Sequence, residues 1–126
     1  PQGRPVILSL SIWNVHGLGS QAKRGFLSSE ARKSKYSLLV IQEPKQNSDK
    51  LPGFAKYLGF PNYLHGSPVN PQIWIYCKNN ISVEAVNWMP QCINTRICVG
   101  SFDLLFSIFN ASTQSLESID FWSHLQ

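Results

Sequence analysis

The fold of this chain is decided by two apolar stretches, Ser11-Ile12-Trp13-Asn14-Val15-His16-Gly17-Leu18 and Leu38-Leu39-Val40-Ile41-Gln42-Glu43. Each has the composition of a β-strand buried on both faces, because Val, Ile and Leu dominate without strict alternation. If a crossover helix joins them, the strands are parallel and end at the same sheet edge. Asn14 and Glu43 would then lie together at that edge, where α/β folds place their ligand sites.

The segment between these strands has the pattern of an amphipathic helix. Ser20 can cap its first turn, and Ala22, Phe26, Leu27 and Ala31 recur at helical spacing on the side expected to pack, while the basic residues fall largely on the other side. Pro44 is expected to keep Glu43 in an extended backbone, because a residue before proline avoids the αR region. The two strands and their connection therefore predict a βαβ unit.

The rest of the chain predicts one mixed sheet in a single α/β (α+β) domain with flanking helices. Strands are predicted over residues 6–15, 36–42, 72–77, 81–88, 92–100 and 103–110. The strands over residues 72–100 are expected to form an antiparallel meander. Residues 46–71 indicate an irregular surface excursion with a short helical turn at 54–58, because prolines and glycines recur there. The apolar spacing of residues 116–125 predicts the start of a helix.

Positive charge is concentrated in the first part of the chain. The net charge is +4, and residues 1–50 carry eight Lys and Arg against three Asp and Glu. The positive electrostatic potential of this region would attract a polyanion, so nucleic acid is the expected partner. The candidates for phosphate contact are Lys23, Arg24, Lys45 and Lys50. A solvated, basic helix face is the simpler alternative.

The cysteines and the hydropathy pattern indicate in which compartment the protein works and whether it contacts a membrane. Cys77, Cys92 and Cys98 are odd in number and lack the spacing of a zinc site or a disulfide framework, so we expect a reducing, intracellular compartment. No apolar run approaches membrane-spanning length, and no membrane partner is expected.

Three motifs, in this order, carry a family resemblance: Ile12-Trp13-Asn14-Val15-His16-Gly17-Leu18-Gly19, Lys23-Arg24, and Leu39-Val40-Ile41-Gln42-Glu43-Pro44-Lys45. Together they resemble the endonuclease/exonuclease/phosphatase superfamily, and within it the endonuclease domains of non-LTR (LINE-type) retrotransposons. Residues 108–113 and 121–125 look like the strand, loop and helix that follow in that family. The resemblance covers nearly the whole chain but only the first half of the family's domain. We therefore expect residues 1–126 to be the N-terminal half of a four-layer α/β/β/α sandwich, with the missing C-terminal half as a partner.

The resemblance also implies a function. In that family an Asn and a Glu at these strand ends line a divalent-metal site, so it implies Asn14 and Glu43 as catalytic and metal-binding residues, with Mg²⁺ or Mn²⁺ as the cofactor. A lone carboxylate helped by an amide suits Mg²⁺, which keeps most of its waters. The implied activity is a metal-dependent phosphodiesterase, an endonuclease acting on DNA, with a nuclear location if it serves a retrotransposon.

A non-catalytic alternative stands beside this hypothesis. The family's later Asp, Asn and His motifs do not occur in these residues, so we expect the chain to be inactive alone. The alternative is a degenerate relic that at most binds nucleic acid through its basic helix. Taken singly, Asn14 would fit a turn and Glu43 a solvated carboxylate. A half-domain is also expected to expose an inner apolar face, including residues 6–10 and 104–109, and so to aggregate.

Overall fold

The structure is a computed structural model that describes residues 5–34, 36–64, 72–89, 92–109 and 115–124. Its elements follow one another as β1 (Pro5–Asn14), α1 (Gln21–Ser34), β2 (Leu38–Gln42), a 3₁₀ turn η1 (Ser48–Lys50), α2 (Leu51–Leu58), β3 (Asn62–Leu64), β4 (Ile73–Cys77), β5 (Ser82–Met89), β6 (Cys92–Val99), β7 (Phe102–Phe109) and β8 (Ser115–His124). Neither α1 nor α2 is long and apolar enough to cross a bilayer.

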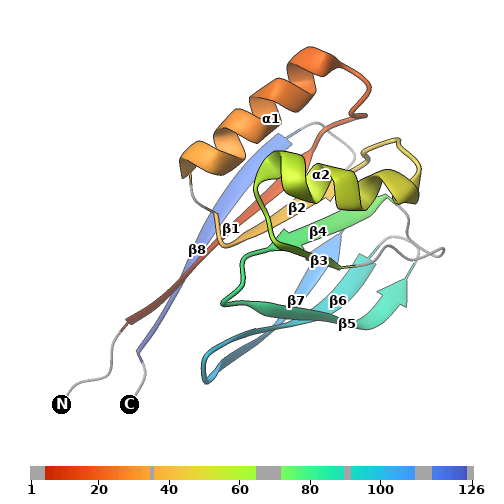
Figure 1. Ribbon diagram of the computed structural model, residues 1–126. Helices are drawn as coiled ribbons and strands as arrows, with labels where there is room; N and C mark the ends of the chain where they lie inside the picture. Colours follow the sequence, from red (N-terminus) through yellow and green to blue (C-terminus); the bar gives the residue numbers. More distant parts are fainter. Residues whose placement is uncertain (1–4, 35, 65–71, 90–91, 110–114, 125–126) are drawn as a thin grey trace.

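The described strands form two sheets (Figure 1). The first sheet has the order β3-β4-β2-β1-β8, and the second has the order β5-β6-β7. β1 and β2 are parallel, with Asn14 opposite Gln42, whereas the other neighbours in both sheets are antiparallel. The predicted α/β class and the predicted βαβ unit are therefore confirmed.

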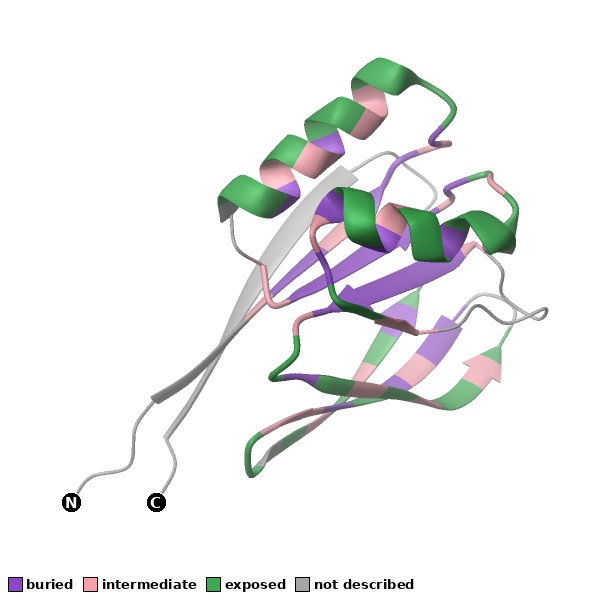
Figure 2. Cartoon of the chain, in the orientation of Figure 1, coloured by how far each residue is buried: buried purple, intermediate pink, exposed green. Residues whose placement is uncertain are grey.

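The first sheet is the middle of three layers, with α1 and α2 on one face and the second sheet on the other (Figure 2). Alternate residues of β2 serve the two faces, because Leu39 and Ile41 pack with the helices while Leu38 and Val40 pack with the second sheet. α1 buries Leu27 and Ala31 as its spacing predicts, whereas Ala22 and Phe26, predicted on the same side, are exposed. β2 is thus apolar throughout because both of its faces are covered.

The single sheet and the meander predicted for residues 72–100 are wrong. β4 belongs to the first sheet, where β2 and β3 occupy its two edges, so no edge is left for β5. The chain turns after β4, where the carbonyl of Lys78 accepts a hydrogen bond from the N–H of Ile81 at 3.1 Å. This turn leads the chain from the first sheet to the second. The meander that forms is β5-β6-β7.

The segment predicted to be an irregular excursion contains a helix and a short strand, α2 and β3. Pro52 stands in the first turn of α2, where its missing N–H costs nothing, and Gly59 ends the helix in the left-handed region at φ 88°. Tyr76 donates its hydroxyl to the carbonyl of Leu51 at 2.9 Å, which fixes α2 on the sheet. Burial raises the pKa of that phenol.

The helix predicted over residues 116–125 is also wrong, because the backbone there forms β8. β8 pairs antiparallel with β1 along the whole of its length, from Pro5 opposite His124 to Asn14 opposite Ser115. The edge of β1 opposite β2 would otherwise leave its backbone N–H and C=O groups without ladder partners. Ile, Phe and Trp in this segment suit a strand as well as a helix, so the open edge decides its conformation.

The inner face expected to be exposed is covered where the structure describes its side chains. Leu10 and Ile108 are fully buried between the two sheets. Leu105 and Phe109 are exposed, at 69% and 66%, because alternation along β7 turns them to the outer face of the second sheet. The side chains of residues 6–8 lie outside the described part of the chain.

The contact between the two sheets predicts a matched pair of stability effects. Ile97→Ala removes a buried side chain from this contact and should lower the free energy of unfolding by about 3 kcal/mol. Leu105→Ala, on an exposed position, should change it by less than about 0.5 kcal/mol. Urea unfolding followed by circular dichroism measures both. Equal effects would mean that the second sheet does not pack on the first in solution.

Candidate metal and phosphate site

The candidate site forms where β1 and β2 leave the first sheet. The strands are parallel, and the ladder continues for one more bond, from the N–H of Val15 to the carbonyl of Gln42 at 3.0 Å. Beyond it, the N–H of Gly17 donates to the carbonyl of Glu43 at 2.7 Å. The two segments therefore leave the sheet side by side.

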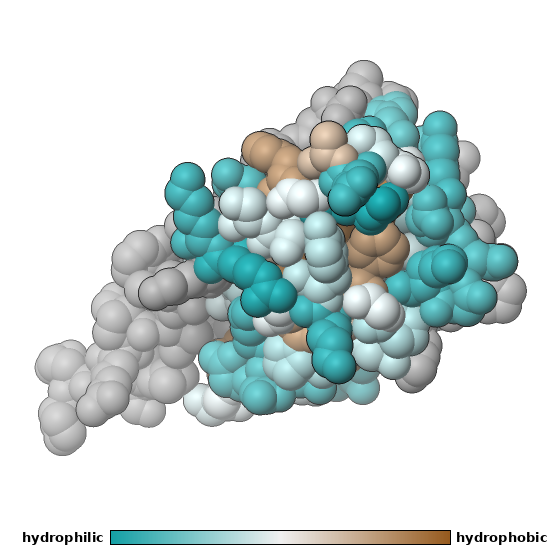
Figure 3. Space-filling model, turned by 45° about the horizontal axis from the view of Figure 1, so that its top comes forward, coloured by the Kyte–Doolittle hydropathy of each residue, from teal (hydrophilic) through white to brown (hydrophobic). Residues whose placement is uncertain are grey.

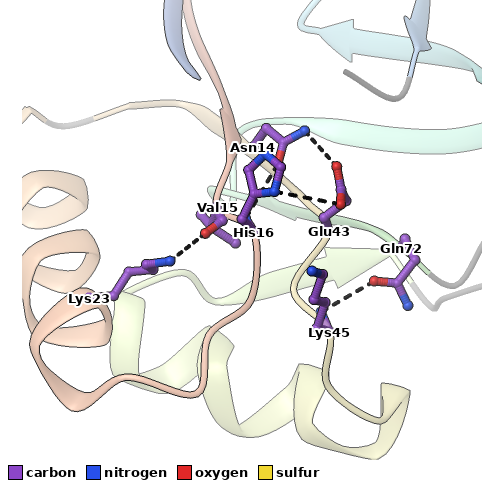
Figure 4. A network of polar contacts seen from close by, with 7 residues as sticks. All are labelled: Asn14, Val15, His16, Lys23, Glu43, Lys45 and Gln72. Carbon is purple, nitrogen blue, oxygen red and sulfur yellow. Dashed lines mark hydrogen bonds and ion pairs between the residues drawn. The ribbon is translucent and has the colours of Figure 1, made fainter. Parts of the chain in front are cut away.

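Asn14 and Glu43 are in direct contact (Figure 4). The Nδ2 of Asn14 donates to Oε2 of Glu43 at 2.9 Å, an orientation that a carboxylate demands because it can only accept. Asn14 is 1% exposed, whereas the side chain of Glu43 is 26% exposed. The predicted juxtaposition is confirmed, and the carboxylate that it holds can be reached from solvent.

His16 completes this small network. Its backbone N–H donates to Oδ1 of Asn14 at 3.3 Å, and its Nδ1 lies 3.9 Å from Oε1 of Glu43. The amide of Asn14 thus holds the loop with its oxygen and the carboxylate with its nitrogen. His16 was not predicted at this site, because the histidines of this chain lack the spacing of metal ligands.

The backbone at Glu43 is not extended as predicted. Glu43 has φ 54°, and His16 and Lys45 have φ 51° and 52°, so all three lie in the left-handed region. Pro44 excludes αR at Glu43 but does not prevent this alternative. Such a conformation costs about 1–2 kcal/mol per residue and persists only where the surroundings impose it.

Two glutamines impose the path of this segment, and neither was predicted as a site residue. The carbonyl of Gln72 accepts from the N–H of Glu43 at 2.8 Å, and its Oε1 accepts from the N–H of Lys45 at 3.2 Å. Gln42 is buried and donates its Nε2 to the carbonyl of Phe109, which ties β2 to the second sheet. A buried amide in an apolar strand was a usable signal for Gln42, but nothing local marks Gln72.

The predicted basic residues divide into two groups. Nζ of Lys23 donates to the carbonyl of Val15 at 2.7 Å, so this cation borders the loop that leaves Asn14. Lys45 is exposed, and its aliphatic chain lies 3.6 Å from the position that a Cβ on Gly17 would occupy. Figure 4 shows Lys45 next to Glu43 and Lys23 reaching from α1 to the carbonyl of Val15.

Arg24 and Lys50 lie elsewhere. Nη1 of Arg24 donates to the carbonyl of Leu18 at 2.7 Å, and the side chain lines a pocket between α1 and α2. Lys50 lines the same pocket from η1. The four cations therefore lie in two separate places.

The donor atoms at this site suit a hard divalent cation. The carboxylate of Glu43 is a hard oxygen ligand in reach of solvent, and Mg²⁺ typically takes one or two carboxylates and keeps several waters. Within the described ranges, no three His, Cys, Asp or Glu side chains come together to form a larger set of ligands. Asn14, with both ends of its amide engaged, is placed to orient Glu43.

Comparison with known proteins gives the fold. No family model matches the sequence, and no curated protein matches it. The structure is similar to that of an endonuclease/exonuclease/phosphatase family protein from Bacteroides thetaiotaomicron, with a TM-score of 0.57 and 15% identity over 83% of this chain and 49% of that one. It is also similar to the endonuclease domain of TRAS1, a telomere-specific non-LTR retrotransposon, with a TM-score of 0.57 and 13% identity over 85% of this chain and 47% of that one. The resemblance predicted from the motifs is confirmed at the level of the fold, and this chain spans about half the length of each of these two.

The contact between Asn14 and Glu43 predicts a pH-dependent cost for a second carboxylate. Asn14→Asp should lower the free energy of unfolding by about 2 kcal/mol near pH ~7, because two ionised carboxylates would then meet. The loss should shrink towards pH ~4, where one of the two carboxyls takes up a proton.

Urea unfolding at the two pH values measures this effect. Asn80→Asp adds the same charge at an exposed turn position and serves as the control. If Asn14→Asp costs the same at both pH values, the two side chains are not in contact in solution.

Proposed function

We propose that this chain is the N-terminal half of a Mg²⁺- or Mn²⁺-dependent phosphodiesterase that cuts DNA, an endonuclease. The observation that carries the proposal is the 2.9 Å bond from Asn14 to Glu43, which holds a solvent-accessible carboxylate where two parallel strands end. The fold shared with the TRAS1 endonuclease domain supports DNA as the substrate. If the chain acts as a retrotransposon endonuclease, it would work in the nucleus.

Each residue of the site has a proposed role. Glu43 would hold the metal, and Asn14 would orient Glu43 through its amide nitrogen. The bound ion would polarise a phosphoryl oxygen and offset the charge on the leaving oxygen. Lys45, exposed beside the site, would contact a neighbouring phosphate.

The groups that activate water and protonate the leaving oxygen would come from another part of the domain. This chain spans about half the length of each of the two similar solved chains named above. Hydrolysis needs a general base within reach of the attacking water. We therefore propose that the missing half supplies these groups and that the chain has little activity alone.

A binding-only relic is the second candidate, because the ligand set among the described residues is small enough to be a remnant of a larger site. One carboxylate with one amide is a small site, and a domain that had lost its catalytic half could keep its cations. Such a protein would bind DNA without cutting it and would not need Glu43.

Metal binding and DNA nicking separate the two candidates. The wild-type chain should take up Mn²⁺, measured by the loss of the free-ion signal in electron paramagnetic resonance, and Glu43→Gln should weaken this uptake at least about 100-fold because it removes the ligand. Nicking of supercoiled plasmid with Mg²⁺, if detected, should fall with it.

The control for this experiment is Glu84→Gln, which removes an exposed carboxylate from β5 in the second sheet. It should leave both readouts unchanged. If Glu43→Gln takes up Mn²⁺ like the wild type, Glu43 is not a metal ligand and the proposed metal site is wrong. DNA binding without Mn²⁺ uptake would identify the relic.

The placement of Lys45 predicts a local contribution to DNA binding. Lys45→Gln should reduce the slope of log K against log salt for a short duplex by about 0.9, the value for one phosphate contact. Lys33→Gln, in the last turn of α1, removes an exposed charge far from the site and should leave the slope nearly unchanged. Fluorescence anisotropy across a salt series measures both, and equal slopes would mean that net charge alone attracts DNA.

A further inference from the structure

A pocket of about 430 Å³ lies between the N-terminal part of α1, the turn η1 and α2. Its volume is within the range of small-ligand sites. Figure 3 views this helical side of the molecule, where hydrophobic atoms show among hydrophilic ones. The pocket is lined by Gln21, Arg24, Asp49, Lys50, Gly53, Phe54 and Tyr57.

The pocket exists because the two helices are fastened at one end only. The carbonyl of Tyr57 accepts from Oγ of Ser28 and from Nη2 of Arg32, both at 2.9 Å, and the same guanidinium lies against Gly59. Towards the other end, a Cβ built on Gly53 meets nothing within 4 Å. The missing side chain of Gly53 therefore keeps this space open.

The lining combines aromatic rings with positive charge. Phe54 and Tyr57 meet edge to face, with ring centroids 6.3 Å apart, and Tyr57 is 44% exposed. Phe54 rests on the buried ring of Trp74 at 5.8 Å, so this aromatic wall has a rigid backing. The pocket lining also carries two cations, Arg24 and Lys50, and one carboxylate, that of Asp49. An aromatic wall beside two cations is complementary to a flat ring that carries an anion.

The pocket lies at the edge of the sheet that bears the candidate site. Gln21 begins α1 shortly after the chain leaves Asn14, and Asp49 follows Glu43 by a few residues. We propose that this pocket binds a nucleotide, with its base against Phe54 and Tyr57 and its phosphate against Arg24 and Lys50. The inference deepens the proposed function, on which it rests. The nucleotide is either an unpaired one in a DNA strand or a free mononucleotide.

Two glycines provide a matched test. Gly53→Leu fills the pocket, whereas Gly25→Leu places the same side chain on α1 at a position where a Cβ also meets nothing within 4 Å and which does not line this pocket. Both changes replace a helical glycine by a better helix former, so neither should lower the melting temperature. A loss of binding confined to Gly53→Leu is therefore a loss of the pocket.

The measurement is fluorescence anisotropy with a labelled oligothymidine single strand and a blunt duplex of equal length. Gly53→Leu should weaken single-strand binding about 10-fold, because base stacking on an aromatic ring is lost, and should change duplex binding less than about twofold. Gly25→Leu should bind both like the wild type. Unchanged single-strand binding by Gly53→Leu, or an equal loss for both DNAs, would overturn the proposal.

Thymidine monophosphate distinguishes the two sources of the nucleotide. If it displaces the single strand from the wild type but not from Gly53→Leu, the pocket takes a free nucleotide. If it fails to displace the strand while Gly53→Leu still weakens strand binding, the pocket takes a nucleotide within a strand. The uptake of Mn²⁺ at Glu43 is a separate readout, so failure of the pocket and failure of the metal site can be told apart.

Discussion

The parallel pairing of β1 with β2 is the constraint on which the rest of this structure depends. The register that sets Asn14 opposite Gln42 brings Glu43, the first residue after β2, beside the amide of Asn14. An antiparallel pairing would send the two strand ends to opposite edges of the sheet. α1 enforces the parallel arrangement, because a crossover of this length returns the chain to the edge from which β1 began.

The site stores backbone strain and balances it with hydrogen bonds from distant segments. Glu43 and Lys45 are both left-handed, and Gln72, immediately before β4, accepts hydrogen bonds from both of their N–H groups. The strain has a geometric result, because it turns the chain sharply after β2 and directs the carboxylate towards Asn14. The position of Glu43 therefore depends on β4 as much as on its own strand.

The sequence predicted those parts of the fold that local pattern determines. The buried strands β1 and β2, the helix between them and the meeting of Asn14 with Glu43 all follow from apolar runs and crossover geometry. The pairing of β4 and the conformation of β8 depend on which strand edges remain open. A local sequence pattern does not show which edges those are. The left-handed turn at Glu43 escaped prediction because it is held by Gln72, a residue distant in sequence.

The candidate site and the pocket share one packed layer, which makes them mechanically related. Trp13 adjoins Asn14 in β1, and its ring meets Phe26 of α1 at 6.3 Å. Trp74 in β4 is in contact with Phe54, which lines the pocket. Both tryptophans belong to the same buried cluster on the helical face of the first sheet. A closely packed layer transmits displacement, so a ligand that moved α2 would press on the strands that hold Asn14 and Glu43.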